Sequence, residues 1–273
     1  MKENGAEEIK RAVAARYGAH ARKLLDELEA SQASCCGPAE PPTSETSSCA
    51  CGSDAPAEAD LNMARHLYSS EELKDLPEEA LVSLGCGNPM AIAELREGER
   101  VLDLGSGGGL DCFLAARQVG RSGLVYGLDM SVEMVQLARR NAERVGAENV
   151  RFWLGEMEQM PFPSNSFDVI ISNCVINLSP DKDAVLRECF RVLRPGGRLR
   201  VSDIVWTREP SEEERSNLES WTACVAGALT EEAYVSKLRA AGFQNARVER
   251  KGDAETPVGN LFSGYIAAEK ARG

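Results

Sequence analysis

Cysteine is the residue type in this sequence best placed to do chemistry. The chain holds nine cysteines among 273 residues, and their surroundings differ. Cys86 lies between two glycines just before a proline, which indicates a turn that exposes the thiol rather than a place in the core. Cys174 follows an apolar segment, 168–172, that we predict to be a strand. Cys224 lies shortly before Gly227, where packing and function are equally compatible with the sequence.

Four further cysteines, Cys35, Cys36, Cys49 and Cys51, lie in a segment that is poor in large apolar residues. Residues 31–60 are rich in Ser, Ala, Pro and Glu, which predicts a linker or mobile arm without a packed core. Such an arm has no packing reason to keep thiols. A small zinc knot, thiols that capture and hand over a soft ion, and exposed redox-labile cysteines all remain open. Cys112 and Cys189 lie on apolar helix faces and are predicted to be core residues.

The stretch Arg100–Asp111, RVLDLGSGGGLD, predicts the element that positions a ligand near these thiols. A short buried strand runs into a glycine-rich loop, and a helix over 110–119 follows. Backbone amides at such a helix start can lie against a ligand. The buried carboxylate of Asp103 needs a partner, which a ligand with a cationic amino-acid end would supply. Asp129 follows a second strand, where an acid can bind both hydroxyls of a ribose.

The rest of the chain repeats this alternation of strands and helices. Two more strands are predicted over 150–154 and 167–172 and a fifth over 197–202, with a helix from Ser131 to Val145 and another over 181–193. An acidic helix from Pro210 is expected to carry Cys224. A helix over 230–240 and an antiparallel pair of strands, 246–250 and 261–267, would close the sheet. Before all of these, 7–29 predicts a helix that packs on the main domain and is interrupted at Gly18.

These motifs resemble the class I S-adenosylmethionine-dependent methyltransferases over about Arg96 to Asp203. The resemblance implies an α/β, Rossmann-like fold with a mostly parallel seven-stranded sheet and helices on both faces, an N-terminal helical arm and a C-terminal acceptor-side insertion. It divides the chain into an arm (1–75), a cofactor-binding core (76–204) and an insertion with closing strands (205–273). The cofactor-binding residues that it implies are Asp103, Gly105, Ser106, Gly107, Asp129, Met130, Gly155, Glu156, Met157 and Asn173.

Composition limits the possible acceptors of the methyl group. A net charge of −12 argues against nucleic acid, because phosphate backbones need a basic surface. No apolar run approaches the roughly 20 residues of a membrane span, and the charged N-terminus lacks a signal peptide's apolar core. We therefore expect a cytoplasmic, reducing setting in which a disulfide framework does not form, and a monomer as the default state.

Three separated thiols, Cys86, Cys174 and Cys224, would suit a soft, three-coordinate ion if they converged on one cleft. Trivalent arsenic is such an ion, and its lone pair lies opposite the three sulfurs. Here the chain resembles the arsenite methyltransferases, through Gly85–Pro89, Ser172–Asn177 and the segment from Cys224 to Glu231. The resemblance implies three cysteine thiolates that hold arsenic(III). Cys35 or Cys36 would be a relay thiol that takes arsenite from its thiol conjugates.

The implied reaction is methyl transfer from S-adenosylmethionine to arsenic, with glutathione or thioredoxin as thiol reductant. The leaving sulfur begins as a sulfonium and ends neutral, so no general acid or base is required. His20 and His66 are accordingly expected outside the core. A carbon methyltransferase of the quinone or sterol type is the alternative enzyme, and it leaves the three cysteines unexplained. A metalloid- or zinc-binding thiol protein without catalysis is the non-enzymatic alternative, against which the intact cofactor motifs argue.

Overall fold

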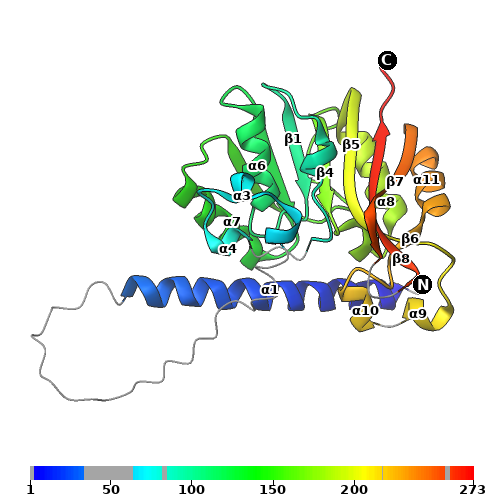
Figure 1. The fold of residues 1–273 in the computed structure, drawn as a ribbon, viewed down its shortest axis with the longest axis horizontal. Coiled ribbons are helices and arrows are strands. Elements are labelled where there is room, and N and C mark those ends of the chain that lie inside the picture. Colours follow the sequence, from blue (N-terminus) through cyan, green and yellow to red (C-terminus); the bar gives the residue numbers. More distant parts are fainter. Residues whose placement is uncertain (1–2, 34–63, 82–84, 217, 256–258) are drawn as a thin grey trace, which may run out of the picture.

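The computed structural model describes residues 3–33, 64–81, 85–216, 218–255 and 259–273. A twisted sheet of eight strands forms its centre, in the order β3-β2-β1-β4-β5-β8-β7, with β6 beside β5 (Figure 1). The strands are β1 (Arg100–Leu104), β2 (Leu124–Asp129), β3 (Val150–Leu154), β4 (Phe167–Asn173), β5 (Leu193–Trp206), β6 (Leu229–Thr230), β7 (Gln244–Glu255) and β8 (Leu261–Glu269).

The strand pairing confirms a mostly parallel sheet with an antiparallel edge. β3, β2, β1, β4 and β5 pair in parallel, whereas β8 pairs antiparallel with both β5 and β7. The seven strands of the main path match the predicted number. The two-residue strand β6, which pairs with the end of β5, is an addition that its short length hid from sequence patterns.

Helices cover both faces of the sheet. They are α1 (Glu3–Ala33), α3 (Ser70–Leu73), α4 (Glu78–Leu81), α5 (Met90–Ala93), α6 (Leu110–Val119), α7 (Val132–Val145), the 3-10 turn η2 (Ile176–Leu178), α8 (Lys182–Val192), α9 (Glu212–Ser216), α10 (Leu218–Thr222) and α11 (Glu231–Ala240).

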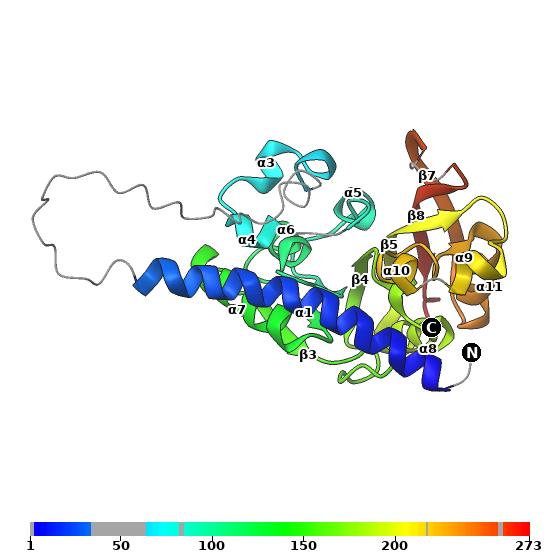
Figure 2. The same ribbon diagram turned by 90° about the horizontal axis from the view of Figure 1, so that it is seen from below.

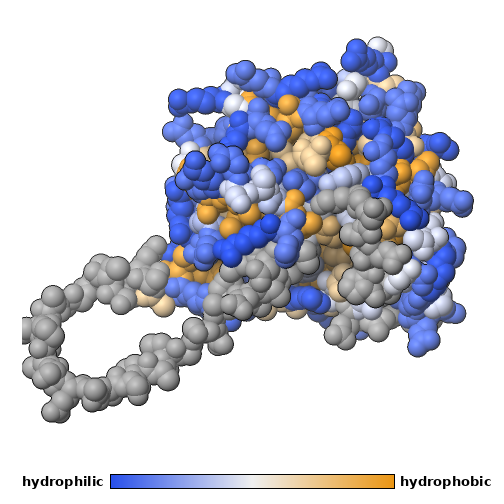
Figure 3. Space-filling model, viewed as in Figure 1, coloured by the Kyte–Doolittle hydropathy of each residue, from blue (hydrophilic) through white to orange (hydrophobic). Residues whose placement is uncertain are grey.

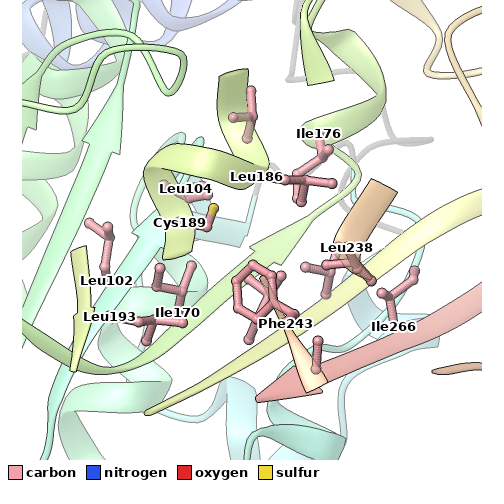
Figure 4. Close-up of a cluster of buried hydrophobic side chains, with 14 of the residues drawn as sticks. Leu102, Leu104, Ile170, Ile176, Leu186, Cys189, Leu193, Leu238, Phe243 and Ile266 are labelled. Carbon is pink, nitrogen blue, oxygen red and sulfur yellow. The ribbon is translucent and has the colours of Figure 1, made fainter. Parts of the chain in front are cut away.

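The core lies on both faces of the sheet, because alternate residues of β1 point to opposite sides. Leu102 and Leu104 pack in one core cluster with residues of α8 and α11 (Figure 4), and Val101 packs in another with α6.

Helix α1 is longer than predicted and is not interrupted at Gly18. It runs continuously from Glu3 to Ala33 beneath the carboxyl ends of the strands, as the view from below shows (Figure 2). At Gly18 the helix lies close to the start of α7, where an added Cβ would come within 3.0 Å of the Glu133 carboxylate and 3.4 Å of the Ser131 hydroxyl. Gly18 is therefore a point of close helix approach, and the packing offsets its low helix propensity.

The predicted position of Cys224 is also corrected. The described residues of this region form α9 and α10 on either side of position 217, and Cys224 lies after the end of α10 rather than within a helix. Its φ of 64° places it in the left-handed region, which ends helical structure.

The surface agrees with the composition. Hydrophilic residues dominate the face drawn in Figure 3, with smaller apolar patches between them. Within the described ranges, no helix combines the length and the apolar character needed to cross a membrane.

Gly127 offers a test of the packing that supports β2. A Cβ there would lie 2.6 Å from the ring of Phe152 and 2.7 Å from the Ser106 hydroxyl. Because the buried ring has little room to move, we expect Gly127→Ala to lower the free energy of unfolding by about 1–3 kcal/mol in urea denaturation. Gly5→Ala in α1 is the control, since no atom lies within 4 Å of its added Cβ. Equal stability of the two variants would contradict this account of β2.

Candidate active site

A cavity lies at the carboxyl ends of β1, β2, β3 and β4, where ligands bind in open parallel sheets. All of the predicted cofactor-binding residues line this one cavity: Asp103, Gly105, Ser106, Gly107, Asp129, Met130, Gly155, Glu156, Met157 and Asn173. Cys174 lines it as well, so the cavity reaches the predicted arsenic site.

Two buried carboxylates occupy the end of the cavity nearest β1. Asp103 accepts a hydrogen bond from the Cys112 thiol at 3.3 Å, and Asp111 accepts one from the Tyr68 hydroxyl at 2.7 Å and one from the Asn173 amide at 3.3 Å. Burial raises the pKa of Asp103 well above its usual range, and the charge of Asp111 adds to the effect. Such a carboxylate still has acceptor capacity for a cationic group. Cys112 is buried, as predicted, and also contributes this hydrogen bond.

Asp129 is held by backbone amides at the turn after β2. Its carboxylate accepts from the amide of Gly107 at 3.0 Å and from that of Ser131 at 2.9 Å. The glycine loop can come this close because Gly105 has a φ of 66° and its added Cβ would meet Val175 at 2.4 Å. The loop and Asp129 therefore form one rigid wall of the cavity.

Helix α1 forms the opposite wall. Lys10, Val13, Ala14, Tyr17 and His20 all line the cavity from this helix. The ammonium of Lys10 lies 2.6 Å from the Glu156 carboxylate and thereby joins α1 to the turn after β3.

His20 lies on α1 outside the buried core of the described residues, as predicted, but the sequence did not indicate that it faces the cavity. Its side chain lines the cavity, and its Nε2 is buried with no hydrogen-bond partner among the described residues. The position of α1 across the cavity could not be read from the helix pattern, which shows periodicity but not what the helix covers. His66 is exposed, as expected.

The three predicted arsenic-binding cysteines do come together. Cys174 and Cys224 belong to one buried apolar cluster, against which Cys86 packs. The Cys224 thiol donates to the Cys174 carbonyl at 2.9 Å. Both Cys174 (φ 59°) and Cys224 (φ 64°) have a left-handed backbone, which is uncommon for residues other than glycine and is often found at functional sites.

Cys86 and Cys174 form a disulfide, which the expectation of a chain without a disulfide framework did not foresee. Their Cα atoms are 5.7 Å apart, close enough for both sulfurs to bond to each other. The expectation rested on the compartment and did not use distance. The sequence could not supply the distance, because the two cysteines are 88 positions apart in the chain.

The turn that carries Cys86 is fixed from several sides. The Asn173 side chain accepts from the Gly87 amide at 3.2 Å and donates to the Gly87 carbonyl at 2.8 Å. The hydroxyl of Ser263 in β8 donates to the Cys86 carbonyl at 3.0 Å. An added Cβ on Gly87 would overlap the Ser202 hydroxyl, so glycine is required where the turn meets β5. Asn173 thus supports Cys86 in addition to lining the cavity.

Asp203 is a buried acid beside the sulfurs that the sequence did not single out. It is fully buried and accepts from the Tyr234 hydroxyl at 3.1 Å. Burial raises the pKa of Asp203 to about 7. Burial also raises the pKa of the Cys224 thiol to about 12, with the charge of Asp203 as the next cause. The only signal in the sequence is an acid at the carboxyl side of a predicted strand.

A buried lysine completes the charged groups around the sulfurs. Lys182 donates to the carbonyls of Asn177 at 3.2 Å and Ser179 at 2.8 Å, and its ammonium lies 5.3 Å from the centroid of the Trp221 ring. Burial lowers the pKa of Lys182 to about 8, partly offset by Asp203.

The remaining cysteines divide into two groups. Cys189 is buried in the large core cluster, as predicted, and burial raises the pKa of its thiol well above the usual range. Cys35, Cys36, Cys49 and Cys51 lie outside the described residues.

Comparison with known proteins agrees with this fold and cavity. A family model described as a methyltransferase domain matches residues 95–242, which is more than half of the chain. The matched range includes the glycine loop, Asp129 and the ends of β3 and β4. The fold and the cavity therefore define a methyltransferase domain.

Individual relatives narrow the family. An arsenite methyltransferase of Halobacterium salinarum is 43% identical over 213 residues, covering 74% of this chain and 54% of the relative. The human arsenite methyltransferase is 41% identical over 169 residues, covering 58% of this chain and 44% of the relative. The crystal structure of an arsenic(III) S-adenosylmethionine methyltransferase from Chlamydomonas reinhardtii matches with a TM-score of 0.57 at 34% identity, covering 78% of this chain and 72% of that one.

The chain belongs to the arsenite methyltransferase family of S-adenosylmethionine-dependent methyltransferases. It spans about half the length of the curated relatives that it matches.

The buried acids predict an unusual pH dependence of stability. Burial raises the pKa of Asp111 to about 6 from its ordinary value of 3.8. A pKa that is higher in the folded than in the unfolded state stabilises the protein fully below the unfolded value, and this stabilisation is lost as the pH rises through the folded value. Asp203, with a pKa of about 7, acts in the same direction.

We therefore expect the free energy of unfolding of the protein without ligands to fall between about pH 4 and about pH 7, from the ordinary pKa of these carboxyls to their values in the folded protein. Urea denaturation across this range measures it. Asp111→Asn should reduce the decline, since the amide does not titrate, whereas Asp26→Asn at an exposed position of α1 should leave it unchanged. A stability that rises over this range would contradict the assignment.

Proposed function

We propose that this protein methylates trivalent arsenic, with S-adenosylmethionine as the methyl donor. The observation that carries the proposal is the convergence of Cys86, Cys174 and Cys224, from three separate parts of the chain, in one cluster, of which Cys174 lines the cavity. Three sulfurs suit a soft, three-coordinate ion and serve no evident purpose in methylating carbon.

The cavity suits S-adenosylmethionine in charge and in shape. Asp103 would accept the cationic amino group of the methionine part, since within the described ranges only the Cys112 thiol donates a hydrogen bond to its buried carboxylate. Asp129 would accept the ribose hydroxyls, and Glu156 and Met157 would lie beside the adenine. The bare backbone at Gly107 leaves room for the ligand, since no atom lies within 4 Å of an added Cβ there. The remaining members of the predicted set, Ser106, Met130, Gly155 and Asn173, complete the wall.

The protein's part in the reaction is to position arsenic. When bound, S-adenosylmethionine supplies a methyl group activated by a positively charged sulfur. Cys86, Cys174 and Cys224, as thiolates, would hold arsenic so that its lone pair faces that methyl group from the Cys174 side of the cavity. Orientation of this kind can supply about 7–11 kcal/mol of the barrier. No proton is transferred to the leaving group, so none of the buried acids is needed as a catalytic acid.

A thiol reductant follows from the disulfide. Cys86 and Cys174 cannot both bind arsenic while they are bonded to each other, so a reductant must first deliver two electrons and two protons to this bond. Glutathione and thioredoxin are the proposed sources. Cys35 or Cys36 would pass arsenite from its thiol conjugates to the site. These roles fit a cytoplasmic, monomeric enzyme.

The direct test incubates the purified protein with S-adenosylmethionine, glutathione and arsenite and separates the arsenic species by mass. Wild-type protein should form methylated arsenic, and Cys86→Ser, Cys174→Ser and Cys224→Ser should each lose about 100-fold or more in kcat/KM, equivalent to about 2.7 kcal/mol. Cys189→Ala is the matched control, because this cysteine lies in the core away from the cavity.

Two results would count against the proposal. If cofactor binds and no methylated arsenic forms, the acceptor is not arsenite. If the Cys189→Ala control loses as much activity as the three variants, the losses reflect folding rather than arsenic binding. Omission of the thiol reductant should stop the reaction in the wild type, because the disulfide then persists.

His20 is expected to contact the cofactor near its ribose. Burial raises the pKa of Tyr17, one turn earlier on α1, and the nearby charge of Asp129 adds to the effect. Leu24, one turn later, packs with Met134 of α7. His20→Leu should therefore weaken binding of S-adenosylhomocysteine about threefold to tenfold in calorimetry, the effect of one hydrogen bond. The exposed His66→Leu serves as control, and an unchanged affinity in His20→Leu would refute the contact.

A further inference from the structure

A carboxylate stands beside the two bonded sulfurs, and methyl transfer to arsenic does not use it. The sulfurs of Cys86 and Cys174 and a carboxylate oxygen of Asp203 all lie within 4.8 Å of one another. Asp203 is completely buried, and its Oδ1 has no hydrogen-bond partner among the described residues. A buried carboxylate oxygen without a partner is costly, so its presence at this place calls for a ligand.

The backbone holds these three groups in place. The Cys174 amide donates to the Ser202 carbonyl at 2.8 Å, which fixes the end of β4 against the residue before Asp203. The Cys86 sulfur lies 3.8 Å from the same carbonyl. Tyr234 orients the carboxylate through its other oxygen, Oδ2, and leaves Oδ1 available. The arrangement is therefore built into the pairing of β4 and β5.

The chemistry of the three donors differs from that of an arsenic site. Trivalent arsenic takes three sulfurs and keeps a lone pair, whereas Zn²⁺ and Cd²⁺ take four donors in a tetrahedron and accept sulfur together with carboxylate oxygen. Two thiolates, one carboxylate and a divalent cation carry a net charge of −1. Burial lowers the pKa of Lys182 to about 8 and the charge of Asp203 offsets part of this effect, so the ammonium of Lys182 would balance the negative charge of the site.

We propose that, once the disulfide is reduced, Cys86, Cys174 and Asp203 bind a divalent thiophilic cation of the Zn²⁺ and Cd²⁺ type. Reduction adds two electrons and two protons to the sulfurs, and ion binding then releases the two thiol protons to solvent. Because the ion takes two of the sulfurs proposed for arsenite, it excludes arsenite from the site. The competition with arsenite rests on the proposed function, whereas binding of the cation is independent of it.

Cadmium binding to the full chain tests the site. The protein is reduced with a phosphine that binds cadmium weakly, and Cd²⁺ is titrated while the sulfur-to-cadmium absorption is followed. Asp203→Asn keeps the size of the side chain and should weaken Cd²⁺ binding about tenfold or more. Its affinity for arsenite should change less than about threefold, since arsenic needs only sulfur. Cys174→Ser should bind neither Cd²⁺ nor arsenite, whereas Cys189→Ala should bind both ions like the wild type.

Cadmium NMR of the wild type reads the donors without any variant, so the proposal stays testable if Asp203→Asn fails to fold. A cadmium chemical shift typical of mixed sulfur and oxygen ligands supports the proposed site, and a chemical shift typical of sulfur ligands alone overturns the proposal. Unchanged Cd²⁺ affinity in folded Asp203→Asn would overturn it as well. If Cd²⁺ binds with Asp203 while arsenite neither binds nor is methylated, the cation site stands and the proposed function fails.

Discussion

The parallel pairing of β4 and β5 is the constraint on which the site depends. The hydrogen bond from the Cys174 amide to the Ser202 carbonyl places a sulfur and the buried carboxylate of Asp203 side by side. The turn at Cys86 then rests on Ser202 from the other side, and this close approach requires a glycine at position 87. A shift of one residue in this register would separate Cys174 from Ser202 and turn the side chains of one strand to the other face of the sheet.

The site also depends on helix α1, because this helix contacts both the cofactor cavity and the cluster of sulfurs. Tyr17 lies near Asp129 in the cofactor cavity and also interacts with Cys224 among the sulfurs. Ion pairs at Lys10 and Arg22 hold the helix to the turn after β3 and to the start of α7. These ion pairs are partly exposed, so each contributes little to stability. The apolar contacts of Ile9, Val13 and Leu24 therefore contribute most of the free energy that keeps α1 packed on the domain.

Much of this structure could be predicted because local signals agree with the fold. The strand and glycine loop at 100–109, and the alternation of strands with helices, gave the sheet and the cofactor cavity. Features that depend on which distant segments meet were hidden. The bond between Cys86 and Cys174, the place of His20 under the sheet and the partner of Asp203 each require three-dimensional distances. Gly18 was misjudged because propensity does not record close helix packing.

The left-handed backbone at Cys174 and Cys224 has a consequence for how this sequence can change over time. Glycine or asparagine would relieve about 1–2 kcal/mol of backbone strain at such a position. Natural drift or laboratory selection that rewards stability alone would therefore tend to remove these two sulfurs first. Their presence in the chain implies that selection has acted on something other than folding at both positions. Among related sequences, the loss of both cysteines together would identify lineages in which selection for this function has ended.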